Sequence, residues 1–245
     1  MCTQTTTAPA WNSPDYKNGY NTPAIRDRMF SALLAYRAEI KAGAILNVSI
    51  SSGNSKTHVP SVSISPIFTC PARCKGVCDG KCYAVKGCAI HTSELNAYAR
   101  NLAIYLEQPA RYWQAIRTAA ANVRFFRWHV AGDIVDAAYF SGMIETARAL
   151  PDTAFLAFTK KYEIVNTWID RNGAIPCNFK IVFSGWGDAL KPINPHNLPE
   201  TTVFPKHSEP RPEWLLCGGN CLECACRGVG CWQLQPGDVL AFELH

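Results

Sequence analysis

The fold is determined by the stretch VRFFRWHVAGDIVDAAYFSGMIETARALPDTAFLAFTKK, residues 123–161. It reads as an apolar run, a segment of helical period and a second apolar run. In the middle segment Phe140, Ile144 and Ala147 recur on one helical face, as in a helix that packs on a sheet. A strand followed by a crossover helix and another strand is typical of parallel β-structure.

The alternation extends in both directions from this stretch. It predicts helices at 24–42, 92–107, 109–121, 137–150 and 162–171, and strands at 45–51, 62–68, 123–130, 153–158, 179–183 and 239–243. Residues 185–212 are rich in Pro, Asn and His and are expected to form a loop. The predicted fold class is therefore α/β, a partial or complete parallel (β/α) barrel of TIM-barrel type, followed by a cysteine-rich C-terminal iron–sulfur segment.

Composition excludes several classes of protein. The 245 residues are 48% hydrophobic and 18% charged, which does not fit a disordered chain. No apolar run is long enough to cross a membrane, and residues 1–20 lack the apolar core of a secretory signal, so a cytoplasmic protein without membrane contact is expected. We expect a flexible arm at 1–22, an α/β domain at 23–212 with a cysteine loop at 69–89, and a cysteine-rich segment at 213–245.

Twelve cysteines are the most informative feature of the composition. Nine of them fall into two groups, one in the loop after the predicted strand 62–68 and one near the C-terminus; Cys88 follows the first group, and Cys2 and Cys177 lie apart. A disulfide framework belongs to short secreted chains and spreads its cysteines to join distant loops. Thiols crowded into two short segments instead suit metal ions or iron–sulfur clusters.

The first group comprises Cys70, Cys74, Cys78 and Cys82, each separated from the next by three residues. Lysines and an arginine between and beside them favour the thiolate form and offset the charge of an anionic cluster. A zinc finger or ribbon usually joins two separate pairs of ligands, whereas these four lie in one loop. The spacing favours an iron–sulfur cluster, and a structural zinc loop stays open as the alternative.

The second group contains five cysteines within fifteen residues: Cys217, Cys221, Cys224, Cys226 and Cys231. Four of them suffice to ligate one centre completely, either an iron–sulfur cluster or zinc. The spacing does not decide whether Cys226 or Cys231 is the spare one.

Polar residues follow three of the predicted strands, where parallel α/β proteins bind their ligands. They are His129, Gly132 and Asp133 at the end of the strand 123–130, Lys160 after the strand 153–158 and Ser184 after the strand 179–183. Simpler roles are available for some of them: His129 as a buried structural histidine, Asp133 as a helix N-cap and Lys160 as a solvated lysine. Arg100 and Asn101 lie within a predicted helix and are expected on its surface.

The ordered set of these motifs resembles the phage and mobile-element proteins of the gene product 88 family. The resemblance covers the chain from about residue 45 to the end, and it rests on the following pieces: Gly53-Asn-Ser-Lys56-Thr57, Thr69-Cys70-Pro71 with Cys74 and Cys82-Tyr83-Ala84, Arg100-Asn101, Arg127-x-His129-x-x-Gly132-Asp133, Phe158-Thr159-Lys160, and a terminal Cys-x-x-Cys with Cys-Trp and His245. That family in turn looks related to radical S-adenosylmethionine enzymes, because Cys-Tyr-Ala also closes cysteine loops among them.

The second resemblance implies a cofactor and its ligands. In radical S-adenosylmethionine enzymes three cysteines hold a [4Fe–4S] cluster, and the remaining iron chelates S-adenosylmethionine, whose reductive cleavage releases a 5′-deoxyadenosyl radical. Matched to this sequence, the three ligands are Cys70, Cys74 and Cys82, with Cys78 additional. This spacing departs from the usual one, and a fourth ligand at Cys78 would leave no iron open. The second cysteine group would resemble an auxiliary [4Fe–4S] cluster.

Two hypotheses of function follow. The first is a small radical S-adenosylmethionine-like enzyme that needs an electron donor and acts on an unidentified small molecule or macromolecule. Its catalytic residues would be Asp133 and Lys160, and its cofactor-binding residues His129, Gly132, Asp133 and Ser184. The second is a non-catalytic zinc or iron–sulfur module that docks on a protein or nucleic acid. The net charge of +5 permits contact with phosphates, but no recognised nucleic-acid-binding motif is present.

Overall fold

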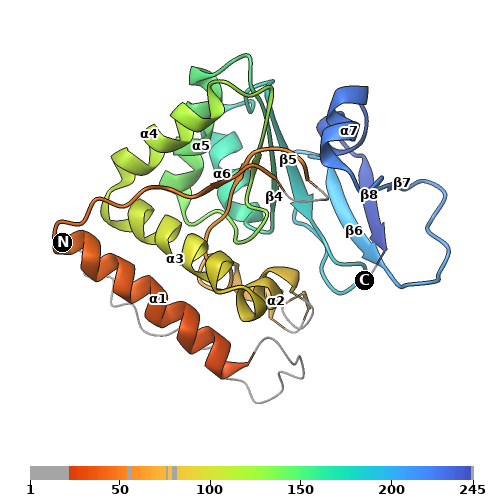
Figure 1. Cartoon of the computed structure of the whole chain (residues 1–245). Helices are drawn as coiled ribbons and strands as arrows, with labels where there is room; N and C mark the ends of the chain where they lie inside the picture. The colour runs from red at the N-terminus through yellow and green to blue at the C-terminus, as the bar shows by residue number, and fades with distance from the viewer. Residues whose placement is uncertain (1–21, 54–56, 76, 79–81, 244–245) are drawn as a thin grey trace.

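A computed structural model describes residues 22–53, 57–75, 77–78 and 82–243 (Figure 1). The predicted arm at 1–22 lies almost wholly outside the described residues. The described strands are β1 (Ile50–Ser51), β2 (Ser61–Val62), β3 (Phe125–Trp128), β4 (Ala154–Thr159), β5 (Phe179–Ser184), β6 (Glu200–Phe204), β7 (Leu215–Leu216) and β8 (Val239–Glu243). The α-helices are α1 (Pro23–Lys41), α2 (Tyr83–Ile90), α3 (Thr92–Glu107), α4 (Pro109–Ala120), α5 (Ala137–Ala149), α6 (Tyr162–Asn172) and α7 (Cys221–Arg227).

All of these strands belong to one sheet. Among the described residues it has eight strands in the order β1-β2-β3-β4-β5-β6-β8-β7. Every neighbouring pair is parallel except β1 and β2. The sheet does not close on itself within these ranges, since β1 and β7 form its two edges. The prediction of a mainly parallel α/β fold is therefore confirmed, and the arrangement is an open sheet rather than a complete barrel.

The helices that the sequence predicts begin and end close to their expected residues because their caps are local. Thr22 caps α1 through its hydroxyl, which accepts a hydrogen bond from Ile25 N at 3.3 Å, and Pro23 follows at the first helical position. Asp136 caps α5 by accepting from Tyr139 N at 2.7 Å. The alternative role of Asp133 as this cap is thus wrong.

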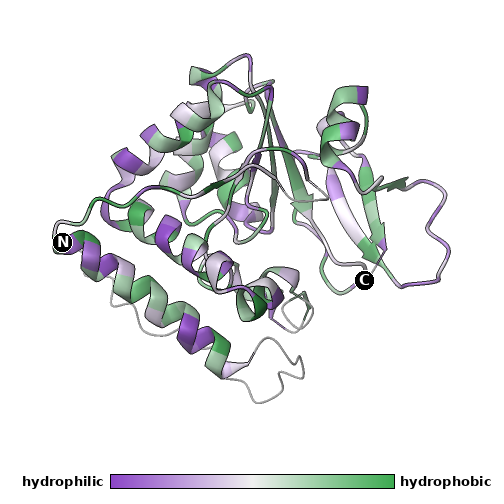
Figure 2. Ribbon diagram, viewed as in Figure 1, coloured by the Kyte–Doolittle hydropathy of each residue, from purple (hydrophilic) through white to green (hydrophobic). Residues whose placement is uncertain are grey.

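The two faces of the sheet are covered by different parts of the chain. Helices α3 to α6 gather on one side, whereas α7 lies on the other side near β6 and β8 (Figure 1). The helix side buries Phe126, Trp128 and Phe155, together with the predicted face of α5. The opposite side buries Leu156 and Val182 against the C-terminal segment. Successive residues point to opposite faces, so the central strands are hydrophobic along most of their length (Figure 2).

Several predicted elements are corrected by the structure. The strands expected at 45–51 and 62–68 shrink to the two-residue β1 and β2. The loop expected at 185–212 contains β6, which pairs with β5 and β8 between Pro199 and Pro205. Helices α2 and α7 were not predicted, because both are short and lie in segments whose cysteines dominate the pattern. No described helix is long and apolar enough to span a membrane.

Asn101 is not on a helix surface as predicted but is almost completely buried in α3. Its Oδ1 accepts a hydrogen bond from Ser49 N at 2.7 Å, and its Nδ2 donates to the carbonyl oxygens of Ser49 and Ser63, both at 2.9 Å. The side chain thereby joins the segments that carry β1 and β2, where the strands form few backbone hydrogen bonds with each other.

Replacing Asn101 with alanine should therefore lower the free energy of unfolding by about 2–4 kcal/mol, because it leaves buried backbone groups without partners. Asn172→Ala is the matched control: that side chain is exposed and donates one bond, to Trp168 O in its own helix, so the change should cost less than about 0.5 kcal/mol. Urea unfolding followed by circular dichroism measures both. Equal losses would show that the Asn101 contacts contribute nothing beyond a surface bond.

Candidate functional site

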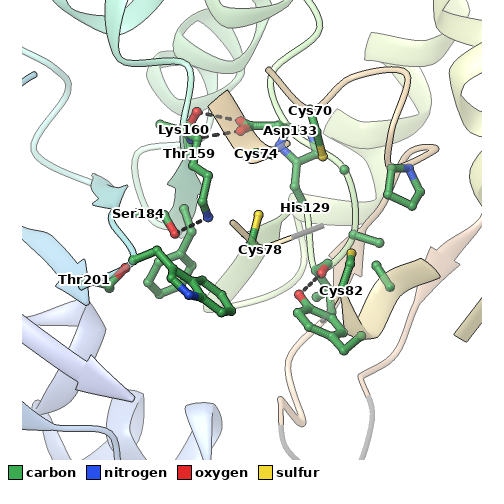
Figure 3. Close-up of a pocket in the computed structure, with 18 of the residues that line it drawn as sticks. Cys70, Cys74, Cys78, Cys82, His129, Asp133, Thr159, Lys160, Ser184 and Thr201 are labelled. Atoms are coloured by element: carbon green, nitrogen blue, oxygen red, sulfur yellow. Dashed lines mark hydrogen bonds between the residues drawn. The ribbon is translucent and has the colours of Figure 1, made fainter. Parts of the chain in front are cut away.

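A pocket of about 360 Å³ lies at the carboxyl ends of β3, β4 and β5 (Figure 3). The structure brings together there every strand-end residue singled out in the sequence and the whole first cysteine group. These lining residues are Cys70, Cys74, Cys78, Cys82, His129, Gly132, Asp133, Lys160 and Ser184. Its size lies within the range of pockets that hold small molecules.

The cysteine loop is fastened at both ends to the turn that follows β3. Before the loop, Thr69 Oγ1 accepts a hydrogen bond from Asp133 N at 3.0 Å. After the loop, the hydroxyl of Tyr83 donates to the carbonyl oxygen of Val130. Gly132 makes the turn possible, because it has a φ of +84° and a Cβ there would lie 2.6 Å from the Ile64 carbonyl oxygen. The first and last cysteines are thus held beside the same strand end.

Asp133 is a buried carboxylate whose oxygens are engaged within the protein. Oδ1 accepts from Ile134 N at 2.7 Å and from Thr159 Oγ1 at 2.5 Å, and Oδ2 accepts from Lys160 N at 2.9 Å. Burial raises the pKa of Asp133, against the opposing effect of these donors. The side chain ties the end of β3 to the end of β4 and so fixes one wall of the pocket.

Lys160 provides a positive charge on the wall opposite the cysteines. Its Nζ donates to Ser184 Oγ at 2.7 Å, which joins the ends of β4 and β5. The hydroxyl of Tyr162 donates to Ser184 O at 2.5 Å and supports the same corner. Lys160 forms no salt bridge within the described residues, so its charge is available to an anionic group in the pocket.

The four thiols differ in their surroundings. Hydrogen bonds with the thiols of Cys70 and Cys78 raise the pKa of Cys74, which is buried between them. The bond from Cys74 and the nearby charge of Lys160 lower the pKa of Cys78 to about 7 despite its burial. Burial raises the pKa of Cys82 to about 11. Hydrogen bonds thus join Cys74 to Cys70 and to Cys78. The cluster ligands that the resemblance implied were Cys70, Cys74 and Cys82.

His129 lines the pocket but is held as a neutral side chain. It is 4% exposed, its Nε2 lies 2.9 Å from the hydroxyl of Tyr139, and burial lowers its pKa to about 3. Its Nδ1 has no hydrogen-bond partner among the described residues. Both roles predicted for His129 fit this placement. Nε2 bonds within the protein, as in a structural histidine, and Nδ1 is left for a cofactor contact.

This histidine predicts a pH dependence of stability. The pKa is lower in the folded chain than the usual 6.5 of an unfolded one, so the unfolded state binds an extra proton between these values and stability falls as the pH falls below about 6.5. Between about pH 7.5 and 5.5 the loss from this group should be about 1.4 kcal/mol. His129→Gln should remove that increment in urea unfolding of the metal-free chain, and an unchanged dependence would contradict a buried neutral histidine.

The second cysteine group is separate from this pocket and packs on the sheet face opposite the helices. Cys221 and Cys224 lie on α7, and Cys231 is buried in the following 3₁₀ turn, Gly230–Trp232. Cys217 and Cys226 are exposed. Arg127 lies between the two groups, since it lines the pocket and its Nη1 donates to Cys221 Sγ at 3.4 Å.

Some lining residues were missed by the sequence interpretation. Thr159 and Tyr83 appear in its motifs but were given no role, although they hold Asp133 and the cysteine loop in place. Trp186 and Phe242 also line the pocket, and only the sheet topology brings them there. Within the described ranges, no group of three or more His, Cys, Asp or Glu side chains is arranged to hold a single metal ion.

Comparison with known proteins identifies a family. No curated protein and no solved structure gives a significant match to this chain. A family model described as gene product 88 matches residues 31–236, which is most of the chain and includes both cysteine groups. The match confirms the family resemblance inferred from the motifs, and the chain belongs to the gene product 88 family.

Proposed function

We propose that the chain is an iron–sulfur protein of radical S-adenosylmethionine type, with one cluster on the loop of Cys70 to Cys82 and an auxiliary centre near the C-terminus. The observation that carries the proposal is the pocket itself, where four thiols face a lysine and a serine across the ends of parallel strands (Figure 3). Ligands of parallel α/β folds bind at this edge.

The donor set of the pocket fits an iron–sulfur cluster. Thiolates are soft ligands that select zinc, copper(I) and iron–sulfur centres. A cluster of iron and sulfide is larger than one ion, so its ligands stand farther apart than those of a single ion. Lys160 lies close enough to Cys78 to stabilise negative charge on its sulfur, as an anionic cluster requires.

The strand order also supports the proposal. From β2 to β6 each strand pairs in parallel with the next one along the chain, and α5 and α6 cross over on the same side (Figure 1). Sequential parallel strands with helices on one side are the arrangement of a partial (β/α) barrel, and the pocket then lies at its mouth. A barrel of this type is part of the proposal.

The polar residues would take different roles around a bound ligand. Lys160 and Ser184 are placed to bind the carboxylate or another anionic group of the cofactor. Asp133 is fully engaged by its own neighbours, so we assign it a positioning role in place of the catalytic one expected from its sequence position. S-adenosylmethionine bound beside a reduced cluster supplies a carbon-centred radical, and the protein supplies orientation and shielding from water.

Anaerobic reconstitution with iron and sulfide tests the proposal. The expected product is brown, binds iron and sulfide in equal amounts, and shows an EPR signal after dithionite reduction that shifts when S-adenosylmethionine is added. Incubation of the reduced protein with S-adenosylmethionine should release 5′-deoxyadenosine. No shift and no 5′-deoxyadenosine would reject the enzyme, and a colourless protein with bound zinc would favour a non-catalytic module.

Single substitutions separate the ligands from their neighbours. Cys70→Ala and Cys74→Ala should abolish the signal of the first cluster, whereas Cys177→Ala changes an exposed cysteine far from it and should not. Cys78→Ala and Cys82→Ala together decide whether the first cluster has an open iron: loss of the cluster in both variants would show that four thiols close it. Lys160→Met should weaken S-adenosylmethionine binding at least tenfold through loss of a charged contact. Lys161→Met is the matched control, because Lys161 does not line the pocket.

A further inference from the structure

The five C-terminal cysteines are not equivalent in the fold. Cys221 and Cys224 are three residues apart in α7 and therefore share one side of the helix. Cys226 follows Cys224 by two residues, which places it on the other side, and it is exposed. Helix geometry alone thus separates one of the candidate spare cysteines from the pair.

The segment before α7 returns to the same side of the helix. Cys217 follows β7, and its backbone N–H donates to Ala241 O of β8 at 3.1 Å. A Cβ on the next residue, Gly218, would lie 3.6 Å from the sulfur of Cys224. The sheet edge therefore brings Gly218, the residue after Cys217, against the sulfur of Cys224.

The segment after α7 converges on the same sulfur. Val229 N donates to Cys224 O at 2.9 Å, and a Cβ on Gly230 would lie 3.2 Å from Cys224 Sγ. Cys231 comes next and is buried, and the indole of Trp232 donates to Cys221 O at 3.1 Å. Both chain segments that flank α7 thus bring a cysteine to the Cys221–Cys224 side.

A cation lies beside these thiols. The guanidinium of Arg127 donates to Cys221 Sγ at 3.4 Å and forms no salt bridge within the described ranges. A cation without a carboxylate partner beside several thiols balances the charge of their ionised form.

We propose that Cys217, Cys221, Cys224 and Cys231 form a closed, four-thiolate metal site and that Cys226 is excluded from it. The site takes an iron–sulfur cluster, because the described thiols are not arranged around a single ion. The inference deepens the proposed function, which leaves the ligands of the second centre open. Because all four positions are thiolates, the centre has no vacant corner for substrate, and its role is to transfer electrons or to hold the C-terminal segment on the sheet.

Cys217 and Cys226 provide a matched pair for the test, since both are exposed in the structure but only Cys217 belongs to the proposed site. The metal-loaded full-length chain is treated with iodoacetamide, and modification is mapped by peptide mass spectrometry. Cys226 should react, and Cys217 should react at least tenfold more slowly until the metal is removed with a chelator. Equal reactivity of the two thiols in the loaded chain, or protection of Cys226 along with Cys217, would overturn the proposal.

Metal content is then measured in a chain whose first-loop cysteines, Cys70, Cys74, Cys78 and Cys82, are all changed to serine. This background isolates the second site from the first. It should keep one centre per chain, counted as iron and acid-labile sulfide, and that centre should be lost in C217S and kept in C226S. A background without any bound metal would overturn this inference while leaving the proposed first cluster untouched. Retention in C217S would exclude that ligand and equally overturn it.

Discussion

A chain carrying Gly132→Ala should be about 3–5 kcal/mol less stable than the parent, the sum of backbone strain and a steric clash. The residue has a φ of +84°, and its Cβ would lie 2.6 Å from the carbonyl oxygen of Ile64 and 2.7 Å from Ile64 Cγ1. The backbone oxygen cannot rotate away as a flexible side chain would, so the turn after β3 must move. Urea unfolding measures the loss.

Gly173→Ala separates strain from clash. Gly173 has nearly the same φ, +82°, but nothing lies within 4 Å of a Cβ placed there. Only backbone strain remains, about 1–3 kcal/mol, because with a ψ of −148° Gly173 lies in a region that essentially only glycine adopts. If both variants lost the same amount, the close approach of Gly132 to Ile64 would not contribute to stability.

Asp133→Ala should cost about 3–5 kcal/mol, because it leaves two buried N–H groups and the Thr159 hydroxyl without their acceptor. The same change should release the walls of the pocket and lower the iron content after reconstitution. Asp136→Ala is the matched control. Asp136 is exposed, caps α5 and accepts from the hydroxyl of Tyr105 at 3.0 Å, so its loss should cost about 1–2 kcal/mol and leave iron binding intact.

Asp133→Asn distinguishes charge from shape. The amide keeps one acceptor oxygen but presents an NH₂ group to a donor, so part of the destabilisation should persist. A variant as stable as the parent would show that the carboxylate is not needed as a double acceptor.

Periodicity predicted the elements that have a clear apolar face. The helices α3 and α4 and the strand β8 begin and end within about a residue of expectation, because the apolar pattern and, in α4, a proline in the first turn lie within the segment itself. The strand ends that form the pocket were also located from the sequence, because the carboxyl ends of parallel strands share one edge of the sheet.

The elements that were missed depend on partners far away in the chain. The strand β6 contains Glu200-Thr-Thr-Val-Phe204 between two prolines, and it becomes a strand because β5 and β8 supply partners on both sides. Asn101 is buried because its side chain bonds backbone groups of Ser49 and Ser63 in place of a neighbouring strand. The distribution of the C-terminal thiols likewise depends on α7, which has about two turns and is too short to show a clear period in the sequence.

The attachment of the cysteine loop has a mechanical consequence. Its entry at Thr69 and its exit at Tyr83 both rest on the turn after β3, through Asp133 N and Val130 O. When the sheet twists, we expect the turn to carry both loop ends with it, so that the gap between them changes little. The proposed cluster would benefit from this, because a centre that accepts electrons needs little rearrangement of its ligands.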